Sequence, residues 1–156
     1  MNEPAFAMLY ARTAGPLCGY LRKLTGNAAV AEDLMQDSYI RFLSAAHVPD
    51  ADDHQRHYLF RIATNLARDY FRRLKYDEHA PRPVAHVLPP SDDSRDVWRQ
   101  LERVSPRDRE LLLLAYVEGL SHAEIAKVTG LMRASVRPLL YRARKRFVAI
   151  VQGGAS

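Results

Sequence analysis

The 156-residue chain is long enough for one domain or two small ones, and its 47% hydrophobic content is sufficient for a buried core. The formal net charge of +5 favours an anionic partner, although the placement of the charges matters more than their sum. The single cysteine, Cys18, excludes a disulfide framework and a cysteine-ligated zinc site, and we expect it in the core. The sequence has no apolar run of transmembrane length and no signal-peptide pattern, which predicts a cytoplasmic protein without membrane insertion.

Two helices are predicted at the start of the chain. Apolar residues recur at helical spacing over residues 4–25, where Gly15-Pro16 should kink or divide the helix. Asn27 follows a turn glycine and can cap a second helix over about residues 28–45.

Acidic residues gather near the beginning of this second helix, where Asp33 and Asp37 are one turn apart. Three interpretations of these carboxylates are open. They form an acid/base or metal pair, a solvated face that the helix dipole favours, or a docking patch for a basic partner. No third ligand or nucleophile is evident, which argues against the first.

A third helix is predicted over residues 58–75, YLFRIATNLARDYFRRLK, because this segment combines an apolar stripe with a polar face. The residues of the polar face recur at spacings of four, three and four, and they are Arg61, Asn65, Arg68 and Arg72. An amide among arginines can hydrogen-bond a base edge, so this face is a candidate for nucleic-acid recognition.

Aromatic and histidine side chains lie around the start of the third helix. Tyr58 and Phe60 offer aromatic surface for stacking on unpaired bases, or they belong to the core. His54 and His57 could share one helical face. Without cysteines or an HExxH pattern nearby, a zinc site there is not expected.

Residues 77–94 are predicted to be a linker, because the stretch is rich in proline and has no helical stripe. It separates a domain over residues 1–76 from a second over residues 95–150. In the second domain a helix is expected near residues 95–104, with Val97 facing inward. Ser105-Pro106 then has the cap and first-turn pattern that begins another helix.

A helix-turn-helix is predicted within residues 120–147, LSHAEIAKVTGLMRASVRPLLYRARKRF. Ser121 and Glu124 have the spacing of a capping box, and Gly130 supplies the turn. The second helix and its extension contain only basic charged residues, namely Arg133, Arg137, Arg142, Arg144, Lys145 and Arg146. A short helical hairpin with a solvated face is the plainer interpretation. The capping box, the turn glycine and the one-sided charge together favour binding to a DNA major groove.

Three segments in order carry a resemblance to a known family. They are DLMQD at 33–37, YLFRIATNLARDYFRRLK at 58–75 and SPRDRELLLLAYVEGLSHAEIAKVTG…SVRPLLYRARKRF at 105–147. Together they resemble the extracytoplasmic-function group of bacterial sigma-70 family RNA polymerase sigma factors, from about Phe6 to Phe147. The resemblance implies an all-α fold. It has a region 2-like domain (1–76), a linker (77–94) and a region 4-like helix-turn-helix domain (95–150).

The resemblance also implies partners and site residues. The expected partners are bacterial core RNA polymerase, through the clamp helices of its largest subunit and its flap, promoter DNA and an anti-sigma factor. Residues matching the polymerase-docking motif are Asp33, Leu34, Gln36 and Asp37. Residues on the part that opens the minus-ten element and captures a flipped base are Tyr58, Arg61, Asn65, Arg68 and Arg72. Residues for the minus-thirty-five duplex are Arg133, Ser135, Arg137, Tyr141 and Arg142.

The chain departs from the family pattern most clearly at Pro138, which lies inside the expected recognition helix. A proline in a helix interior costs about 3 kcal/mol. A late helix start, with Ser135 as the cap, would place Pro138 in the first turn, where its missing amide matters little.

The resulting prediction is an initiation factor without cofactor, metal site or chemistry of its own, since the polymerase holds the catalytic metals. One alternative is a free-standing helix-turn-helix regulator, which leaves the DLMQD helix unexplained. A second is an enzyme or metal-binding protein that uses Asp33, Asp37, His54 and His57. A third is a sigma-like decoy that binds regulators but not DNA, against which the arginines on both predicted DNA faces argue.

Overall fold

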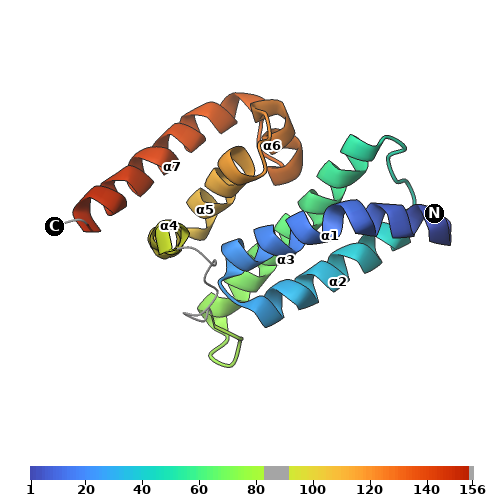
Figure 1. Ribbon diagram of the computed structural model, residues 1–156, viewed down its shortest axis with the longest axis horizontal. Helices are drawn as coiled ribbons and strands as arrows, with labels where there is room; N and C mark the ends of the chain where they lie inside the picture. Colours follow the sequence, from blue (N-terminus) through green and yellow to red (C-terminus); the bar gives the residue numbers. More distant parts are fainter. Residues whose placement is uncertain (83–91, 155–156) are drawn as a thin grey trace.

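The computed structural model describes residues 1–82 and 92–154, and the described chain is all-α, as predicted (Figure 1). The first domain contains α1 (Glu3–Thr25), α2 (Ala28–Ser44) and α3 (Asp52–Tyr76). The second contains α4 (Asp92–Glu102), α5 (Pro106–Leu112), a π-helical turn η1 (Leu113–Val117), α6 (His122–Thr129) and α7 (Arg133–Gly154). Among the described residues, none of these helices has the length and apolarity needed to cross a membrane.

The N-terminal domain is a three-helix unit in which α1 packs on α2 and both pack on α3. Asn2 caps α1 by accepting a hydrogen bond from the Ala5 amide, and Gly26 ends it in the left-handed conformation with a φ of 69°. Asn27 caps α2, as predicted. The third helix begins at Asp52, before the predicted start at residue 58.

Helix α1 runs through Pro16 without interruption, so of the two expected outcomes, a kink or a division at Gly15-Pro16, division does not occur. Both residues are exposed, while Leu9 and Leu17 on the other side of the helix are fully buried. Packing of the buried side, which contains Leu9 and Leu17, keeps the helix continuous. The backbone hydrogen bond that is missing at Pro16 lies on the side that faces solvent. Cys18, expected in the core, is only half-buried.

The C-terminal domain is built around the α5–η1 segment, on which α6 and α7 pack. Ser105 caps α5 and Pro106 occupies its first turn, as predicted. Val97 of α4 is 50% exposed rather than inward-facing, and on the same helix the ring of Trp98 lies 5.1 Å from the Lys23 ammonium.

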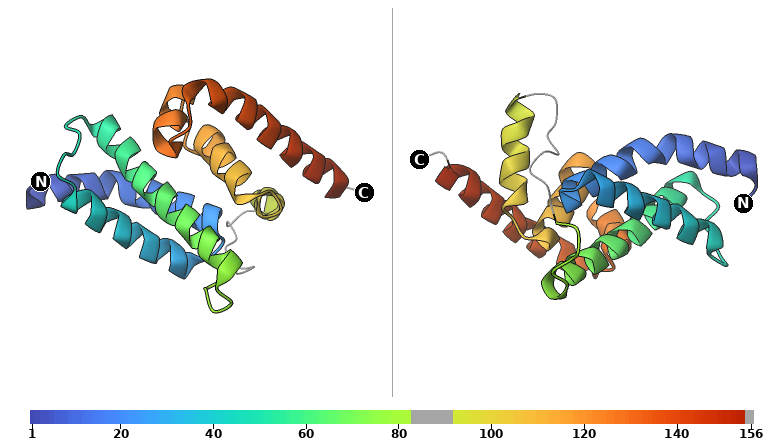
Figure 2. Two further views of the ribbon diagram at one scale, coloured as in Figure 1. Left: turned by 180° about the vertical axis from the view of Figure 1, so that it is seen from behind. Right: turned by 90° about the horizontal axis from the view of Figure 1, so that it is seen from below.

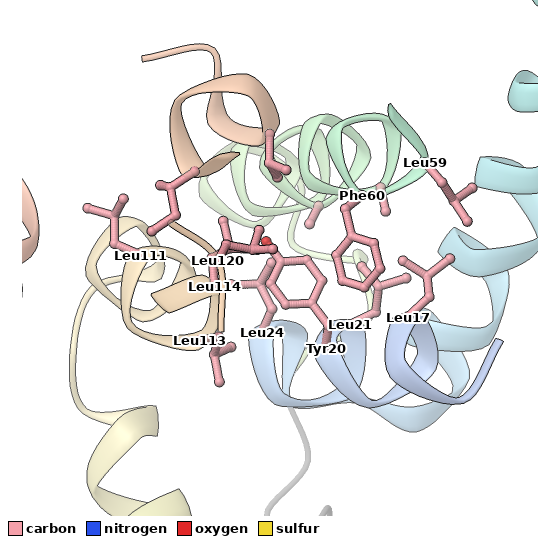
Figure 3. Packing of buried hydrophobic residues seen from close by; sticks show 14 of the residues in the cluster. Leu17, Tyr20, Leu21, Leu24, Leu59, Phe60, Leu111, Leu113, Leu114 and Leu120 are labelled. Atoms are coloured by element: carbon pink, nitrogen blue, oxygen red, sulfur yellow. The ribbon is translucent and has the colours of Figure 1, made fainter. Parts of the chain in front are cut away.

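The two domains share one continuous core. Tyr20 and Leu24 of α1 meet Leu113, Leu114 and Leu120 of the C-terminal domain (Figure 3). Helix α3 packs along α6, while α2 lies at the opposite end of the molecule from the C-terminus of α7 (Figures 1 and 2). The sequence patterns predicted two separate domains. No pattern in the sequence indicated that the two domains share a core.

Candidate functional surfaces

Helix α2 presents the predicted docking residues to solvent. Asp33, Gln36 and Asp37 are exposed and Leu34 is half-buried. Within the described part of the chain these two carboxylates form no ion pair or hydrogen bond. We call Asp33, Leu34, Gln36 and Asp37 the acidic surface. One turn further along α2, Ile40 is 61% exposed, so an apolar side chain borders the acidic surface.

The polar face of α3 is turned toward the C-terminal domain. Arg61 lies over the end of α6, where its Nη1 donates to the Lys127 carbonyl at 3.5 Å. Arg72 is exposed and pairs with Asp69 of its own helix at 2.9 Å. Asn65 is exposed. We call Arg61, Asn65, Arg68 and Arg72 the basic face of α3, and the C-terminal domain partly covers it.

Arg68 makes a two-pronged polar contact between the domains. Its Nε and Nη2 donate to the two carboxylate oxygens of Glu110 in α5, at 3.1 and 2.9 Å. The Glu110 side chain is only 4% exposed, whereas Arg68 is 38% exposed. Burial raises the pKa of the Glu110 carboxyl although Arg68 acts to lower it. The hydrogen bond to Glu110 raises the pKa of Arg68, because the carboxylate stabilises the charged guanidinium, and burial opposes this effect.

A cavity of about 600 Å³ opens between α3 and the C-terminal domain beside this pair. Its wall includes Arg68, Arg72 and Lys75 from α3 and Arg107 from α5. The remaining wall is mostly apolar. The cavity therefore concentrates positive charge along the side of α3 that the sequence predicts to face nucleic acid.

The start of α3 forms a second, smaller hollow of about 260 Å³, lined by Pro49, His54, His57, Tyr58, Arg61 and Lys127. Tyr58 is half-buried against Phe42, with ring centroids 5.7 Å apart. Phe60, in contrast, is 2% exposed and packs on Tyr20, so it is a core residue and not a stacking surface.

His57 joins this hollow to α6. Its Nε2 lies 2.9 Å from a carboxylate oxygen of Glu124, while its buried Nδ1 has no hydrogen-bond partner among the described residues. Burial lowers the pKa of His57, and Glu124 opposes that effect. No cluster of His, Cys, Asp or Glu suited to a metal ion occurs among the side chains that the structure describes, those of residues 1–82 and 97–153.

The helix-turn-helix has the predicted geometry. Ser121 and Glu124 form a complete capping box, and Gly130 turns the chain with a φ of 78°. Of the five residues predicted for duplex recognition, Ser135 is half-buried and four are exposed, namely Arg133, Arg137, Tyr141 and Arg142. The ammonium of Lys145 lies 5.2 Å from the ring centre of Tyr141.

The proposed late start of the recognition helix is wrong. Helix α7 begins at Arg133, and the Ser135 amide already donates to the Met132 carbonyl, so Ser135 is not the cap. Pro138 therefore lies inside the helix. It is exposed, so the carbonyl that it leaves without an amide donor faces solvent, where water can satisfy it.

Sequence reasoning missed Arg109, a buried arginine at the junction of the domains. Its guanidinium donates to the carbonyl of Leu24 at 2.6 Å and to those of Leu101, Glu102 and Val104 at 3.0 to 3.1 Å. The carbonyls of Leu24, Leu101 and Glu102 are at the C-terminal ends of α1 and α4, where partners within the helix are missing, and that of Val104 lies in the turn after α4. The only signal in the sequence is the charged triplet Asp108–Glu110 directly before four leucines, which indicates a helix but not its partners.

Comparison with known proteins identifies the class. Residues 9–76 match the family model of Sigma-70 region 2, and residues 94–147 match that of Sigma-70, region 4. The RNA polymerase sigma factor CarQ of Myxococcus xanthus is 30% identical over 148 residues, which cover 90% of this chain and 85% of that protein. The chain belongs to the sigma-70 family and is an RNA polymerase sigma factor.

Further comparisons identify the group within the family. Several similar proteins are named ECF sigma factors, including SigX of Bacillus subtilis at 24% identity. Our chain is a member of this extracytoplasmic-function group. Among solved structures, CnrH in complex with the cytosolic domain of CnrY is 28% identical, with a TM-score of 0.76 and coverage of 97% of this chain and 90% of that one. The sigma factor RpoE of Bartonella quintana, at 20% identity and a TM-score of 0.76, has the same fold.

Proposed function

We propose that this sigma factor docks on the clamp helices of core RNA polymerase through the acidic surface of α2. The support is that Asp33, Gln36 and Asp37 are exposed and unpaired within the described residues, on a helix that packs on α1 and α3 of its own domain. Exposed carboxylates favour a basic partner and steer its approach. An apolar neighbour, Ile40, adds area that a partner could bury.

We further propose that the basic face of α3 and the hollow at its start recognise the melted minus-ten element. Extruding a base costs a few kcal/mol, which stacking and edge hydrogen bonds must offset. Tyr58 offers a ring edge at a hollow of about 260 Å³, and Asn65 offers an exposed amide on the same helix. Arg61, Arg68 and Arg72 would hold the phosphates.

The helix-turn-helix would bind the minus-thirty-five duplex with the start of α7 in the major groove. Arg133 and Arg137 are exposed one turn apart at that end of the helix, and they suit guanine edges or phosphates. Tyr141 and Arg142 would lie further along the groove. The protein performs no chemistry itself in this proposal.

A cytosolic regulator of the anti-sigma class is a further proposed partner. CnrH, the 28% identical neighbour, was solved with the cytosolic domain of CnrY bound. The metal-binding alternative has no residue cluster to support it among the described residues. A free-standing regulator would not need the region 2 match over residues 9–76.

Charge reversal on α2 tests the docking proposal. Asp33→Arg combined with Asp37→Arg should abolish co-elution with sigma-free core polymerase while circular dichroism stays helical. Reversing two exposed charges elsewhere, with Glu3→Arg at the start of α1 and Glu78→Arg just after α3, is the matched control and should leave binding intact. Equal binding by both double variants would mean that the docking site lies elsewhere.

A further inference from the structure

The loop between α2 and α3, residues 45–51, forms part of the wall of the hollow at the start of α3. Pro49 of this loop lines the hollow together with Tyr58 and Arg61. Ala51, the last residue of the loop, makes no side-chain capping bond to α3, so the usual tie between a loop and the helix that follows it is missing. The position of Pro49 therefore depends on other contacts.

Gln55, near the start of α3, makes such a contact. Its Nε2 donates to the Pro49 carbonyl at 2.9 Å, and its Oε1 accepts a hydrogen bond from Nη2 of Arg12 in α1 at 2.8 Å. Arginine can only donate and a carbonyl can only accept, so the two partners fix which way the amide of Gln55 faces. Within the described chain, no other side-chain hydrogen bond is made to residues 45–51.

The residues around this contact limit how far the loop can move. Val48 is half-buried and packs against the hydrophobic core. The ring of a proline fixes its own φ and also restricts the residue before it, so a hold on the Pro49 carbonyl places the Pro49 ring as well. The packed side chain of Val48 and the bonded carbonyl of Pro49 together set where this wall of the hollow lies.

We propose that Gln55, oriented by Arg12, is a positioning residue that sets the shape of the hollow and thereby determines which base the hollow accepts. The inference rests on the proposed function, because the hollow must receive the flipped base for its shape to matter. A protein that captures an extruded base selects it by the shape of the pocket and by contacts to the edge of the base. Displacing one wall should therefore reduce discrimination between bases.

Three variants separate the contacts of this group. Gln55→Met keeps the length of the side chain and removes both hydrogen bonds. Gln55→Glu keeps an acceptor for Arg12 but, as a carboxylate, has no donor for the Pro49 carbonyl. Asp52→Asn is the matched control, because Asp52 pairs with the same Arg12 at 3.3 Å but is 78% exposed and does not line the hollow. An exposed ion pair of that kind contributes little.

Nuclear magnetic resonance relaxation on the free, full-length chain measures the loop without DNA. The order parameters of the Val48 and Asp50 amides should decrease in both Gln55 variants, because the loop gains motion when its bond to α3 is lost. They should keep their wild-type values in Asp52→Asn. Order parameters that do not change in either Gln55 variant overturn the inference.

Run-off transcription with core polymerase measures the selection of the base. Templates that carry each base in turn at one position of the melted minus-ten element give the ratio of transcription between the preferred base and the others. Uniform effects on folding, on phosphate contacts or on polymerase binding cancel from this ratio, and so does the charge that Gln55→Glu adds. The ratio should fall about tenfold in both Gln55 variants, the value of a good base contact, and stay unchanged in Asp52→Asn.

The outcomes distinguish the inference from the proposed function. A mobile loop with a wild-type base ratio overturns the inference, and so does an equal loss of the ratio in Asp52→Asn. Should Gln55→Met fail to fold, Gln55→Glu decides the question, because its side chain has nearly the shape of glutamine. A wild-type holoenzyme without base preference at any melted position would contradict the proposed function of the hollow, whatever the order parameters of the loop.

Discussion

Replacing Arg109 by methionine should destabilise the whole fold, because this one side chain ties α1, α4 and α5 together. Arg109 is 7% exposed, and its guanidinium donates hydrogen bonds to the carbonyls of Leu24, Leu101, Glu102 and Val104. Methionine fills a similar volume but donates no hydrogen bond.

The magnitude follows from those bonds. A hydrogen bond from a charged donor contributes about 1.5–3 kcal/mol, and a buried carbonyl left unpaired costs about 1–3 kcal/mol. Burial disfavours the charged guanidinium and lowers the pKa of Arg109, so part of this gain is already offset in the wild type. We therefore expect Arg109→Met to lower the free energy of unfolding by about 4 kcal/mol, which is less than the summed contributions of the four hydrogen bonds. For a chain of this size that lowers Tm by about 10 °C.

Thermal and urea unfolding followed by circular dichroism measure this effect. Arg107→Met is the matched control, because Arg107 is exposed on the same helix and has no hydrogen bond or ion pair within the described residues. A surface substitution of that kind should change the free energy of unfolding by less than about 0.5 kcal/mol. If Arg109→Met unfolds within about 0.5 kcal/mol of Arg107→Met, the claim that Arg109 joins the helices is refuted.

Two further variants test the recognition surface and the domain contact. Asn65→Ala should weaken promoter-specific run-off transcription by about tenfold, the value of a good base contact, while binding of core polymerase is unchanged; an equal loss of both would contradict its role as a base reader. Because burial lowers the pKa of His57 from 6.5, the unfolded chain binds the proton first as the pH falls through that value, so the free energy of unfolding should decrease. Glu110, whose pKa is raised, contributes the opposite slope, so we compare His57→Gln with the wild type by urea unfolding between about pH 7.5 and 5.5. The free energy of unfolding of the variant should decrease less on acidification than that of the wild type. If it depends on pH in the same way for both proteins, protonation of His57 does not contribute to the loss of stability.

Local sequence signals predicted most of the helices and their caps. Asn27, Ser105 and Ser121 all cap the helices assigned to them, because a side-chain oxygen near free amides acts within a single turn. At both prolines the helix continues, where the sequence allowed for a division at Pro16 and a later helix start before Pro138. Pro16 and Pro138 both lie on exposed sides of their helices, and periodicity alone does not report how firmly the opposite side is packed.

Contacts between distant segments could not be predicted. The sequence identified Arg68 as a free cation on a basic face, but its partner Glu110 lies 42 residues away in the other domain. Arg109 reaches Leu24 across 85 residues. No local pattern distinguishes a solvated arginine from one that pairs across a domain boundary, because the choice depends on which surfaces meet. The assigned docking and DNA residues stay predictions until variants test them.

Co-elution of the purified chain with sigma-free bacterial core RNA polymerase, at moderate salt on a sizing column, tests the central claim most directly. The docking proposal predicts a stable complex that survives the column and initiates at defined promoters in a run-off assay. A folded chain that elutes alone, beside a core enzyme active with another sigma factor, would contradict it.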